Sequence, residues 1–469
     1  MKEKSEPKNR INLSLFGAAE EVTGSNYLLE GGFSGETTRL LVDCGFFQGS
    51  RISEEKNNEP FSYNPPSIDA LLVTHAHLDH IGRIPKLVKN GFKGKIFSTP
   101  PTRDFSKLML IDSLGVLEKE SKRNKHQEVI YNERDVNATM NLWEVARYGE
   151  SFSVGGFNVV LRDAGHILGS AMVEAAFPYG GETDAQKIVF SGDLGNSPEP
   201  LLKDTEKIND ADFLVVESTY GDRSHEGAEE ADIKLERIIE DIVRRRGVLM
   251  IPAFSLERTQ RVLFQINNLV ENGRIPKVPI FLDSPLSIQA TRIYKNYSDY
   301  YNDEAKELML ADDDLFHFPG LTQVLATEES KKIANVSPPK IIIAGSGMCN
   351  GGRILHHLLN YLSGRENVLL LVSYQAAGSL GRQLKDGAKT LNIMGKEVVV
   401  EAKIEKIGGY SSHVDMDKLF EFVGNSADTL KKVFVAHGEL KSSLFFTQRL
   451  RDYMGVDAIV PKFGKSYEL

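Results

Sequence analysis

Three histidines and an aspartate stand close together at residues 75–80, directly after an apolar run. The run, residues 70–74, predicts a short buried strand. Because side chains alternate along a strand, His75 and His77 at its end point to the same side of the chain, where both imidazoles would bind one cation. Few structural needs would gather so many imidazoles, so the segment predicts a strand end built around bound metal.

The next two residues of the cluster, Asp79 and His80, begin a predicted helix over residues 81–88. The changed backbone direction would aim their side chains at a second cation beside the first. Imidazole and carboxylate suit zinc, and the absence of a thiolate from the cluster argues against a structural cysteine-type site. The motif therefore predicts an open, catalytic metal site. The alternative is a polar strand-to-helix corner whose histidines bond to backbone groups.

The composition is that of an ordinary globular chain, and 469 residues are enough for two domains. The two cysteines, Cys44 and Cys349, lie far apart and suggest no disulfide framework, which fits a cytoplasmic location. The N-terminus is charged, and no apolar run approaches the roughly 18 residues of a membrane span, so we expect no membrane contact. The net charge of −9 argues against a generally basic nucleic-acid coat but leaves a local basic groove open.

The hydrophobic pattern changes along the chain, which indicates two architectures. In the first part, strands are predicted over 11–16, 26–29, 38–42, 151–161, 170–177 and 187–191, with helices over 104–125 and 133–148. Beyond residue 222, helices over 230–246, 256–272 and 287–309 alternate with strands over 247–252, 278–282, 340–344 and 368–373, as in a parallel α/β domain. Two later strands, 397–407 and 433–436, are expected to return the chain to the first domain.

Four further residues lie at predicted strand ends or beside glycines, where the backbone can approach a metal closely: His166, Asp193, His413 and His437. Asp193 follows a predicted strand, and from there one carboxylate could bridge two cations. Each residue alone is equally compatible with a structural histidine or a turn aspartate. Their shared placement favours one assembled site.

Together these residues closely resemble the metallo-β-lactamase superfamily, whose His-x-His-x-Asp-His hallmark is present at residues 75–80. Asp43, His166 and Asp193 look like its first, third and fourth motifs. Within the superfamily, Glu217, His413 and His437 resemble motifs A, B and C of the β-CASP nucleases. The chain is thus similar to the endonuclease subunit of the cleavage and polyadenylation specificity factor. Tyr410 and Ser412 depart from the Phe and Ala of many relatives, which leaves the surroundings of His413 open.

The resemblance implies an α/β fold, a metallo-β-lactamase αββα sandwich with an inserted β-CASP α/β domain whose parallel sheet is flanked by helices. The expected domains are residues 1–222 for the first part of the metallo-β-lactamase domain, 223–394 for the β-CASP domain and 395–469 for the C-terminal return. We expect a compact, bacterial-type member without added RNA-binding domains.

The resemblance also implies two zinc ions (Zn²⁺) per chain as cofactors. His75, His77 and His166 would bind one ion, Asp79, His80 and His437 would bind the other, and Asp193 would bridge them. A hydroxide bridging the metals would attack the phosphodiester bond in line. His413, Glu217 and Asp79 are the expected catalytic residues, with His413 as general acid oriented by Glu217. Asp43 would hold a ligand imidazole or a nearby loop in place.

Two glycine-rich loops offer a separate site for phosphates. The first contains Ser346, Gly347 and Met348, and the second contains Gly378, Ser379, Gly381 and Arg382. Each loop lies between a predicted strand and a helix, so its backbone N–H groups can cradle a phosphate, and Arg382 can add a bidentate contact. A nucleotide cofactor is a rival reading that the glycine spacing does not favour. The glycines could also serve only as tight turns.

We therefore predict a zinc-dependent ribonuclease that hydrolyses single-stranded RNA in a cleft between the domains, for RNA processing or decay. It is expected to act as an endonuclease, with exonuclease activity left open. A DNA nuclease is the first alternative, because contacts to the RNA 2′-hydroxyl cannot be located from one sequence. A small-molecule hydrolase and a non-catalytic RNA-binding subunit are less compatible with the large second domain and the complete ligand set. The resemblance is compatible with a homodimer.

Overall fold

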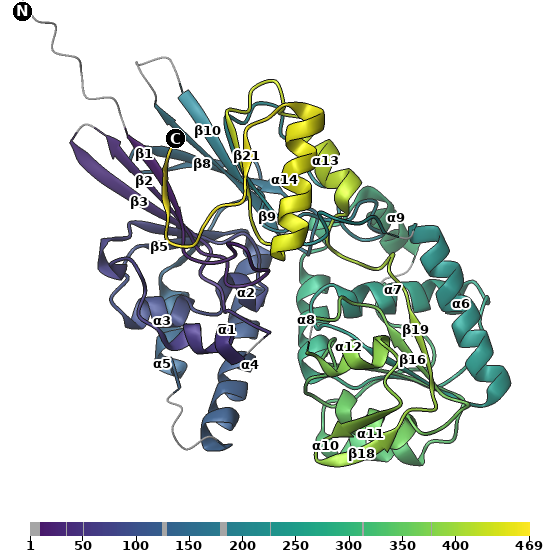
Figure 1. Ribbon diagram of the computed structural model, residues 1–469. Coiled ribbons are helices and arrows are strands. Elements are labelled where there is room, and N and C mark those ends of the chain that lie inside the picture. Colours follow the sequence, from purple (N-terminus) through teal and green to yellow (C-terminus); the bar gives the residue numbers. More distant parts are fainter. Residues whose placement is uncertain are drawn as a thin grey trace, which may run out of the picture. The chain divides into compact units, whose positions relative to one another are not determined.

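The computed structural model describes residues 10–33, 35–49, 51–123, 129–178, 185–225, 227–311, 314–376 and 378–469. The chain separates into two compact units, each traceable by colour in Figure 1. Unit 1 comprises Met1–Glu199, Lys203–Ser224 and His413–Leu469. Unit 2 comprises Pro200–Leu202 and His225–Ser412.

Unit 1 contains two seven-stranded sheets, with strand orders β22-β1-β2-β3-β4-β5-β6 and β21-β20-β11-β10-β9-β8-β7. The first sheet consists of β1 (Ile11–Leu15), β2 (Tyr27–Phe33), β3 (Glu36–Val42), β4 (Ala70–Leu72), β5 (Lys95–Ser98), β6 (Trp143–Val145) and β22 (Ser466–Glu468). The second consists of β7 (Ser151–Val154), β8 (Phe157–Asp163), β9 (Ala171–Pro178), β10 (Ala185–Phe190), β11 (Phe213–Val216), β20 (Lys432–Val435) and β21 (Ala458–Ile459).

Alternate residues of these strands form one apolar core between the two sheets. Leu13 and Leu15 of β1 belong to the same buried cluster as Val173 and Ala175 of β9. The intervening residues point outward, as the two-residue period of a strand requires. Val433 and Val435 of β20 accordingly join a second core on the outer face of the second sheet, beneath α13 and α14.

Helices cover the outer faces of the sandwich, as Figure 1 shows for α13 and α14 beside the second sheet. Their bounds are α1 (Arg51–Glu55), α2 (Leu78–Ile81), α3 (Ile84–Lys89), α4 (Pro100–Arg123), α5 (Glu133–Asn141), α13 (Met416–Gly424) and α14 (Leu440–Met454). Helices outside two facing sheets make an αββα sandwich, so the predicted fold of the first domain is confirmed.

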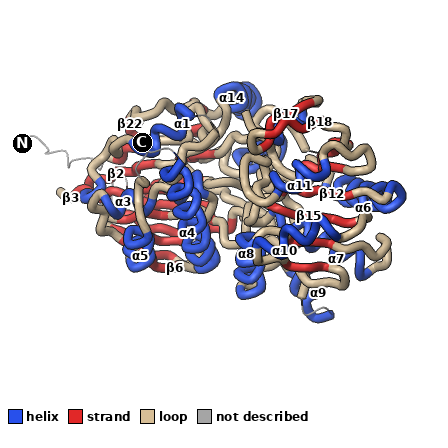
Figure 2. Tube along the Cα trace, turned by 90° about the horizontal axis from the view of Figure 1, so that it is seen from below, coloured by secondary structure: helices blue, strands red, loops and turns tan. Residues whose placement is uncertain are grey.

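Unit 2 is built on a parallel six-stranded sheet of order β14-β13-β15-β12-β16-β19. Its strands are β12 (Val248–Pro252), β13 (Ile280–Leu282), β14 (Leu321–Gln323), β15 (Lys340–Ala344), β16 (Val368–Leu371) and β19 (Lys403–Lys406), and a hairpin joins β17 (Thr390–Ile393) to β18 (Lys396–Val399). Every residue of β12 and β15 is buried, as expected for strands covered on both faces. Figure 2 shows helices on both sides of this sheet.

The helices of unit 2 are α6 (Ala228–Arg245), α7 (Arg258–Glu271), α8 (Pro285–Asn296), α9 (Asp303–Ala311), α10 (Thr327–Lys332), α11 (Ile354–Tyr361) and α12 (Leu380–Lys385). Short 3₁₀ turns occupy Lys56–Asn58, Pro65–Ser67, Ser298–Tyr300 and Ile333–Asn335. In the described part of the chain, no helix is long and apolar enough to cross a bilayer.

Some predicted elements differ from the structure. The helix predicted over 133–148 ends at Asn141, because Trp143–Val145 pairs with β5 as strand β6 and the Trp143 indole donates to Ser98 Oγ at 2.9 Å. Residues 151–161 form a hairpin rather than one strand, and residues 81–88 fall in two short helices, α2 and α3. Residues 395–412, which we expected to return to the first domain, lie in unit 2, because β19 adds to the edge of its parallel sheet.

A buried ionic network in unit 2 joins the end of β13 to α10 and α11. The fully buried carboxylate of Asp283 accepts from Arg353 Nη1 at 2.7 Å, His357 Nε2 at 2.7 Å and Ser330 Oγ at 2.6 Å. Burial alone would raise its pKa, but the hydrogen bonds from His357, Ser330 and Arg353 lower the pKa of Asp283 below the ordinary value. The charged form of Asp283 therefore holds α10 and the start of α11 against the end of β13.

Replacing Asp283 by Asn should destabilise unit 2 by about 3 kcal/mol, because one amide cannot satisfy three donors and leaves Arg353 without its counterion. Urea unfolding followed by circular dichroism measures the change. The matched control is Asp386→Asn, which breaks an exposed pair with Arg382 and should cost under about 1 kcal/mol. Equal losses in the two variants would contradict the role given to Asp283.

Candidate metal centre

The predicted metal motif lies at the carboxyl end of β4, and Asp43 at the end of β3 holds it in place. Asp43 is fully buried, and its carboxylate accepts from Thr74 N at 2.8 Å and Thr74 Oγ1 at 2.8 Å. The same carboxylate lies 2.7 Å from His80 Nδ1, which leaves Nε2 of that ring to face the centre. The strand ends of β3 and β4 thus fix the imidazole of His80 from behind.

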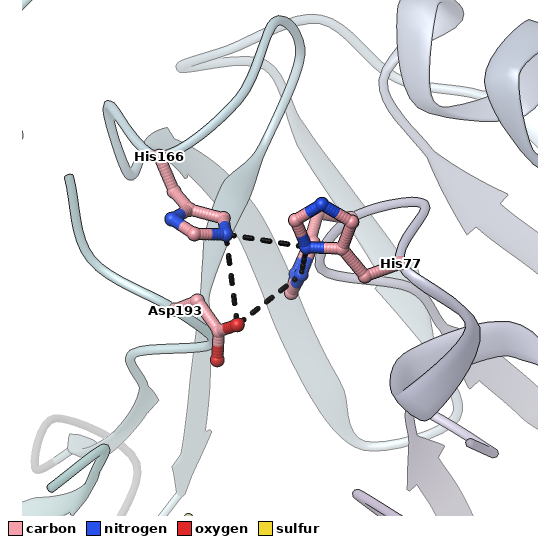
Figure 3. Close-up of side chains that lie close together, drawn as sticks. His77, His166 and Asp193 are labelled. Atoms are coloured by element: carbon pink, nitrogen blue, oxygen red, sulfur yellow. Dashed lines mark hydrogen bonds and ion pairs between the residues drawn. The ribbon is translucent and has the colours of Figure 1, made fainter. Parts of the chain in front are cut away.

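Four side chains gather in the first group: His75, His77, His166 and Asp193. His77 Nδ1 lies 3.0 Å from His75 Nε2 and 3.3 Å from His166 Nε2. Asp193 Oδ2 lies 3.4 Å from His75 Nε2 and 3.6 Å from His166 Nε2. Figure 3 shows His77 and His166, on separate loops, converging beside Asp193.

The second group contains Asp79, His80 and His437 and lies on the other side of Asp193. Asp193 Oδ1 is 3.3 Å from His80 Nε2 and 3.3 Å from His437 Nε2, and His437 Nε2 is 3.9 Å from Asp79 Oδ2. The two oxygens of one carboxylate therefore face two different groups of ligands. That is the arrangement that a bridging carboxylate requires.

The donor set suits a metal, as the resemblance implies. His80 Nε2 and Asp193 Oδ1 are buried without a hydrogen-bond partner among the described residues, which is costly unless another species binds them. Burial, and then the neighbouring His80, lower the pKa of His75 to about 3. Burial and the nearby His413 likewise lower the pKa of His166 well below its usual value. Both imidazoles are therefore neutral at pH 7, the form that binds a cation.

The predicted catalytic pair, His413 and Glu217, lies at the edge of this cluster. Glu217 is buried, with Oε1 accepting from Leu194 N at 2.6 Å and Oε2 lying 3.2 Å from His413 Nδ1. Burial lowers the pKa of His413, but the charges of Glu217 and Asp193 outweigh it and raise the pKa to about 9. His413 Nδ1 also lies 3.9 Å from Asp193 Oδ2. A protonated imidazole is thus held beside the metal groups.

Sequence reasoning missed two hydroxyl groups that support the cluster. Thr74 Oγ1 lies 3.1 Å from His75 Nδ1 and 3.3 Å from His80 Nδ1, and Ser25 Oγ lies 3.0 Å from His437 Nδ1. The threonine next to the histidine motif was a usable signal. Ser25 gave none, because only the folded chain brings it beside a residue 412 positions away.

The predicted phosphate loops lie next to each other in unit 2. Gly381 N donates to Met348 O at 3.1 Å, and Gln375 Nε2 donates to Gly347 O at 2.9 Å. The hydroxyls of Ser346 and Ser379 serve their own loops, accepting from the amides of Gly351 and Arg382 respectively. The Arg382 guanidinium pairs with Asp386, and Gly378 begins the second loop in an exposed turn. The structure therefore brings the two loops together but gives both serines structural partners.

Three segments of the chain match known families. Residues 20–133 match the metallo-beta-lactamase superfamily, residues 259–384 match the Beta-Casp domain, and residues 397–461 match the Zn-dependent metallo-hydrolase RNA specificity domain. A ribonuclease of Thermus thermophilus is 35% identical over 450 residues, which cover 96% of this chain and 98% of the relative. The chain belongs to the β-CASP family of the metallo-β-lactamase superfamily.

Two further relatives of this β-CASP chain come from archaea. An RNase J-like protein of Methanocaldococcus jannaschii is 32% identical, covering 91% of this chain and 93% of the relative. Transcription termination factor FttA of Methanosarcina mazei is 30% identical, covering 92% of this chain and 67% of the relative.

The crystal structure of a protein of unknown function from Enterococcus faecalis has the same fold, with a TM-score of 0.56 and 12% identity, over 98% of this chain and 100% of that chain. The predicted family is confirmed, and membership in a metallo-hydrolase superfamily implies metal binding.

Replacing Asp43 by Asn should lower metal affinity about 10- to 100-fold while leaving the fold intact, because an amide cannot accept from both Thr74 groups and from His80. Competition against a chromophoric chelator measures the affinity, and circular dichroism checks the fold. Asp69→Asn is the matched control, since the Asp69 carboxylate accepts a backbone N–H of Arg39 at 2.7 Å away from the cluster. Unchanged affinity in Asp43→Asn would contradict its orienting role.

Proposed function

We propose that this β-CASP protein is a zinc-dependent ribonuclease that cuts single-stranded RNA endonucleolytically. The observation that carries the proposal is the division of the two Asp193 oxygens between two histidine-containing groups, with His413 beside the same carboxylate. A ribonuclease and an RNase J-like protein are among the relatives, and residues 397–461 match an RNA specificity domain, which supports RNA as the substrate.

Seven residues would hold two zinc ions. His75, His77 and His166 belong to one group, Asp79, His80 and His437 belong to the other, and Asp193 would bridge them. Two zinc ions in such a site supply Lewis acidity for the phosphodiester and activation of the attacking water. Asp79 would contribute to catalysis by holding its ion at the correct position.

His413 would act as the general acid. Its Nδ1 faces Glu217, which would leave Nε2 to carry a proton toward the leaving oxygen of the cut strand. Glu217 is tied to Leu194 N by its other oxygen, so it would fix the direction of the His413 ring as well as its charge. In this assignment Glu217 is a positioning residue and His413 is the proton donor.

The glycine loops of unit 2 would hold phosphates of the RNA backbone. Among the described residues, the amides of Gly347 and Met348 donate to no protein acceptor, and Gly347 has no room for a Cβ because Phe254 lies against it. Gly378, Ser379 and Gly381 would support the second loop, and Arg382 would have to leave Asp386 to reach a phosphate. Ser346 would shape its loop rather than bind the phosphate itself.

The working context would be RNA processing or decay in the cytoplasm. Both cysteines, Cys44 and Cys349, are buried and free, which suits a reducing compartment. A DNA nuclease is the competing function, because the contacts that separate RNA from DNA are made to the 2′-hydroxyl. A direct comparison of matched RNA and DNA strands decides between the two.

Purified protein with two equivalents of zinc should cut end-labelled single-stranded RNA and leave the matched DNA strand intact, and His77→Ala should reduce the cleavage rate by at least about 1,000-fold. Labels at either end separate internal cuts from stepwise trimming. Unchanged circular dichroism of His77→Ala shows that the loss is not unfolding. An undiminished rate in this variant would contradict the metal-dependent mechanism. Equal cutting of DNA would contradict the preference for RNA.

A pH profile tests the roles of His413 and Glu217. If protonated His413 is the acid, activity is present below its pKa and is lost as the pH rises through it. Glu217→Gln removes a charge that raises this pKa, so the alkaline loss should move about 1 to 2 pH units lower. Glu174→Gln, which changes a buried glutamate outside the site, should leave the limb in place. An alkaline limb of the pH profile that stays in place in Glu217→Gln would contradict the assignment. So would a loss of bound metal in His413→Ala equal to that in His77→Ala.

A further inference from the structure

A small cavity of ≈ 30 Å³ in unit 1 surrounds the buried guanidinium of Arg83. Arg83 is 5% exposed, and its Nε donates to Gly45 O at 2.6 Å. The rings of Phe47 and Phe61 flank the guanidinium, with their centroids 4.5 and 5.5 Å from its central carbon. This positive charge takes no part in the metal cluster.

The described residues give Arg83 no carboxylate partner. Its Nη2 is buried without a hydrogen-bond partner among the described residues. Burial of an unpaired charge is strongly unfavourable, and arginine cannot escape the cost by losing its proton. The two aromatic rings offset only part of that cost. The guanidinium therefore has no counterion among the residues that the structure describes.

Two further polar atoms in the same cavity, Tyr63 Oη and Asn26 Oδ1, are buried without a well-formed hydrogen bond among the described residues, although the Asn26 and Cys44 side chains lie near enough to Tyr63 to affect its pKa. Burial raises the pKa of Tyr63 well above its usual value, so the phenol keeps its proton and can donate. Three chain segments thus aim unsatisfied polar atoms into one small space. Orphaned groups in a native structure point to a bound species.

The surroundings favour an anion over water alone. Lys56 Nζ lies 4.9 Å from the Phe47 centroid, and Lys86 Nζ lies 5.2 Å from the Phe61 centroid, so three cations border the same two rings. Lys56 is paired with Glu21, and Lys86 donates to backbone carbonyls of Asn57 and Glu59. The side chain of Glu59 is exposed at the rim. Of the three cations, only Lys56 and Arg83 line the cavity, and Glu59 is the one carboxylate in its lining, so positive charge exceeds negative charge among the lining residues.

We propose that this cavity binds a tetrahedral oxyanion of the phosphate or sulfate class, held by Arg83 Nη2 and the hydroxyl of Tyr63. Its volume is roughly two to three times the 10–15 Å³ that holds one water on this measure, which suits an oxyanion head and excludes a nucleobase. Asn26 Oδ1 accepts from one water beside the anion.

The bound anion would support the metal groups from behind. Arg83 holds Gly45 O, Gly45 N donates to Ser25 O at 3.0 Å, and Ser25 N donates to Asp79 O at 2.9 Å. A Cβ on Gly45 would lie 1.5 Å from Asp79 O, so these backbones are in direct contact. An anion that fixes Arg83 therefore fixes the backbone that carries Asp79.

Crystals of the zinc-loaded protein soaked in selenate test the proposal. The expected result is an anomalous selenium peak within hydrogen-bond distance of Arg83 Nη2 and Tyr63 Oη, absent from Arg83→Met. Position separates this peak from any selenate at the metal centre, and the readout does not depend on nuclease activity. A second soak with adenosine monophosphate distinguishes a free oxyanion from a phosphate ester. Ordered water only at Arg83, or a peak that persists in Arg83→Met, overturns the proposal.

Thermal unfolding provides the solution test with matched variants. Sulfate stabilises proteins generally, so sulfate and chloride are compared at equal ionic strength in the wild type, Arg83→Met and Arg147→Met. Arg147 is an exposed arginine of unit 1 outside the cavity. The extra sulfate stabilisation should be present in the wild type and Arg147→Met and lost in Arg83→Met. An equal sulfate effect in all three proteins would contradict a specific site.

Discussion

The buried carboxylate of Asp193 is the group on which the organisation of unit 1 depends. It is 2% exposed and lies within 3.9 Å of five imidazoles: His75, His80, His166, His413 and His437. A buried carboxylate without positive partners costs several kcal/mol, so the surrounding chain must supply cationic or polarisable groups. The neighbouring imidazoles lower the pKa of Asp193 well below its usual value despite its burial. The carboxylate therefore stays ionised and holds two groups of ligands together.

The groups around Asp193 come from the carboxyl ends of the parallel strands in the sandwich. Functional residues come directly after or within three residues of five strands: Asp43 after β3, His75 after β4, Asp193 after β10, Glu217 after β11 and His437 after β20. β3 pairs in parallel with β4, and β11 pairs in parallel with both β10 and β20, so each sheet presents these residues at one edge. The long excursion into unit 2 lies between β11 and β20, which explains how an inserted domain leaves the site intact.

This placement explains how much the sequence could predict. Apolar runs followed by His75, Asp193 or His437 can be recognised in the sequence, and a strand end fixes where the next side chain points. Ser25 and Arg83 carry no such signal, since their roles depend on loops that meet only in the folded chain. Likewise, no sequence signal indicated that residues 395–412 belong to unit 2 rather than to the first domain. Pairing with β16, rather than its own sequence, determines which sheet the edge strand β19 joins.

Two residues of the candidate metal centre have strained backbones. Asp43 and His437 both have positive φ, at 57° and 47°, where non-glycine residues cost about 1 to 3 kcal/mol each. Three hydrogen-bond contacts to Thr74 and His80 hold Asp43, while His437 N donates to Ala18 O at 2.8 Å and its ring meets Ser25. The fold therefore offsets both the strain and the crowding of imidazoles with its own contacts. A cation bound there would relieve the remaining cost at His80 Nε2 and Asp193 Oδ1, so metal binding would be thermodynamically linked to the stability of unit 1.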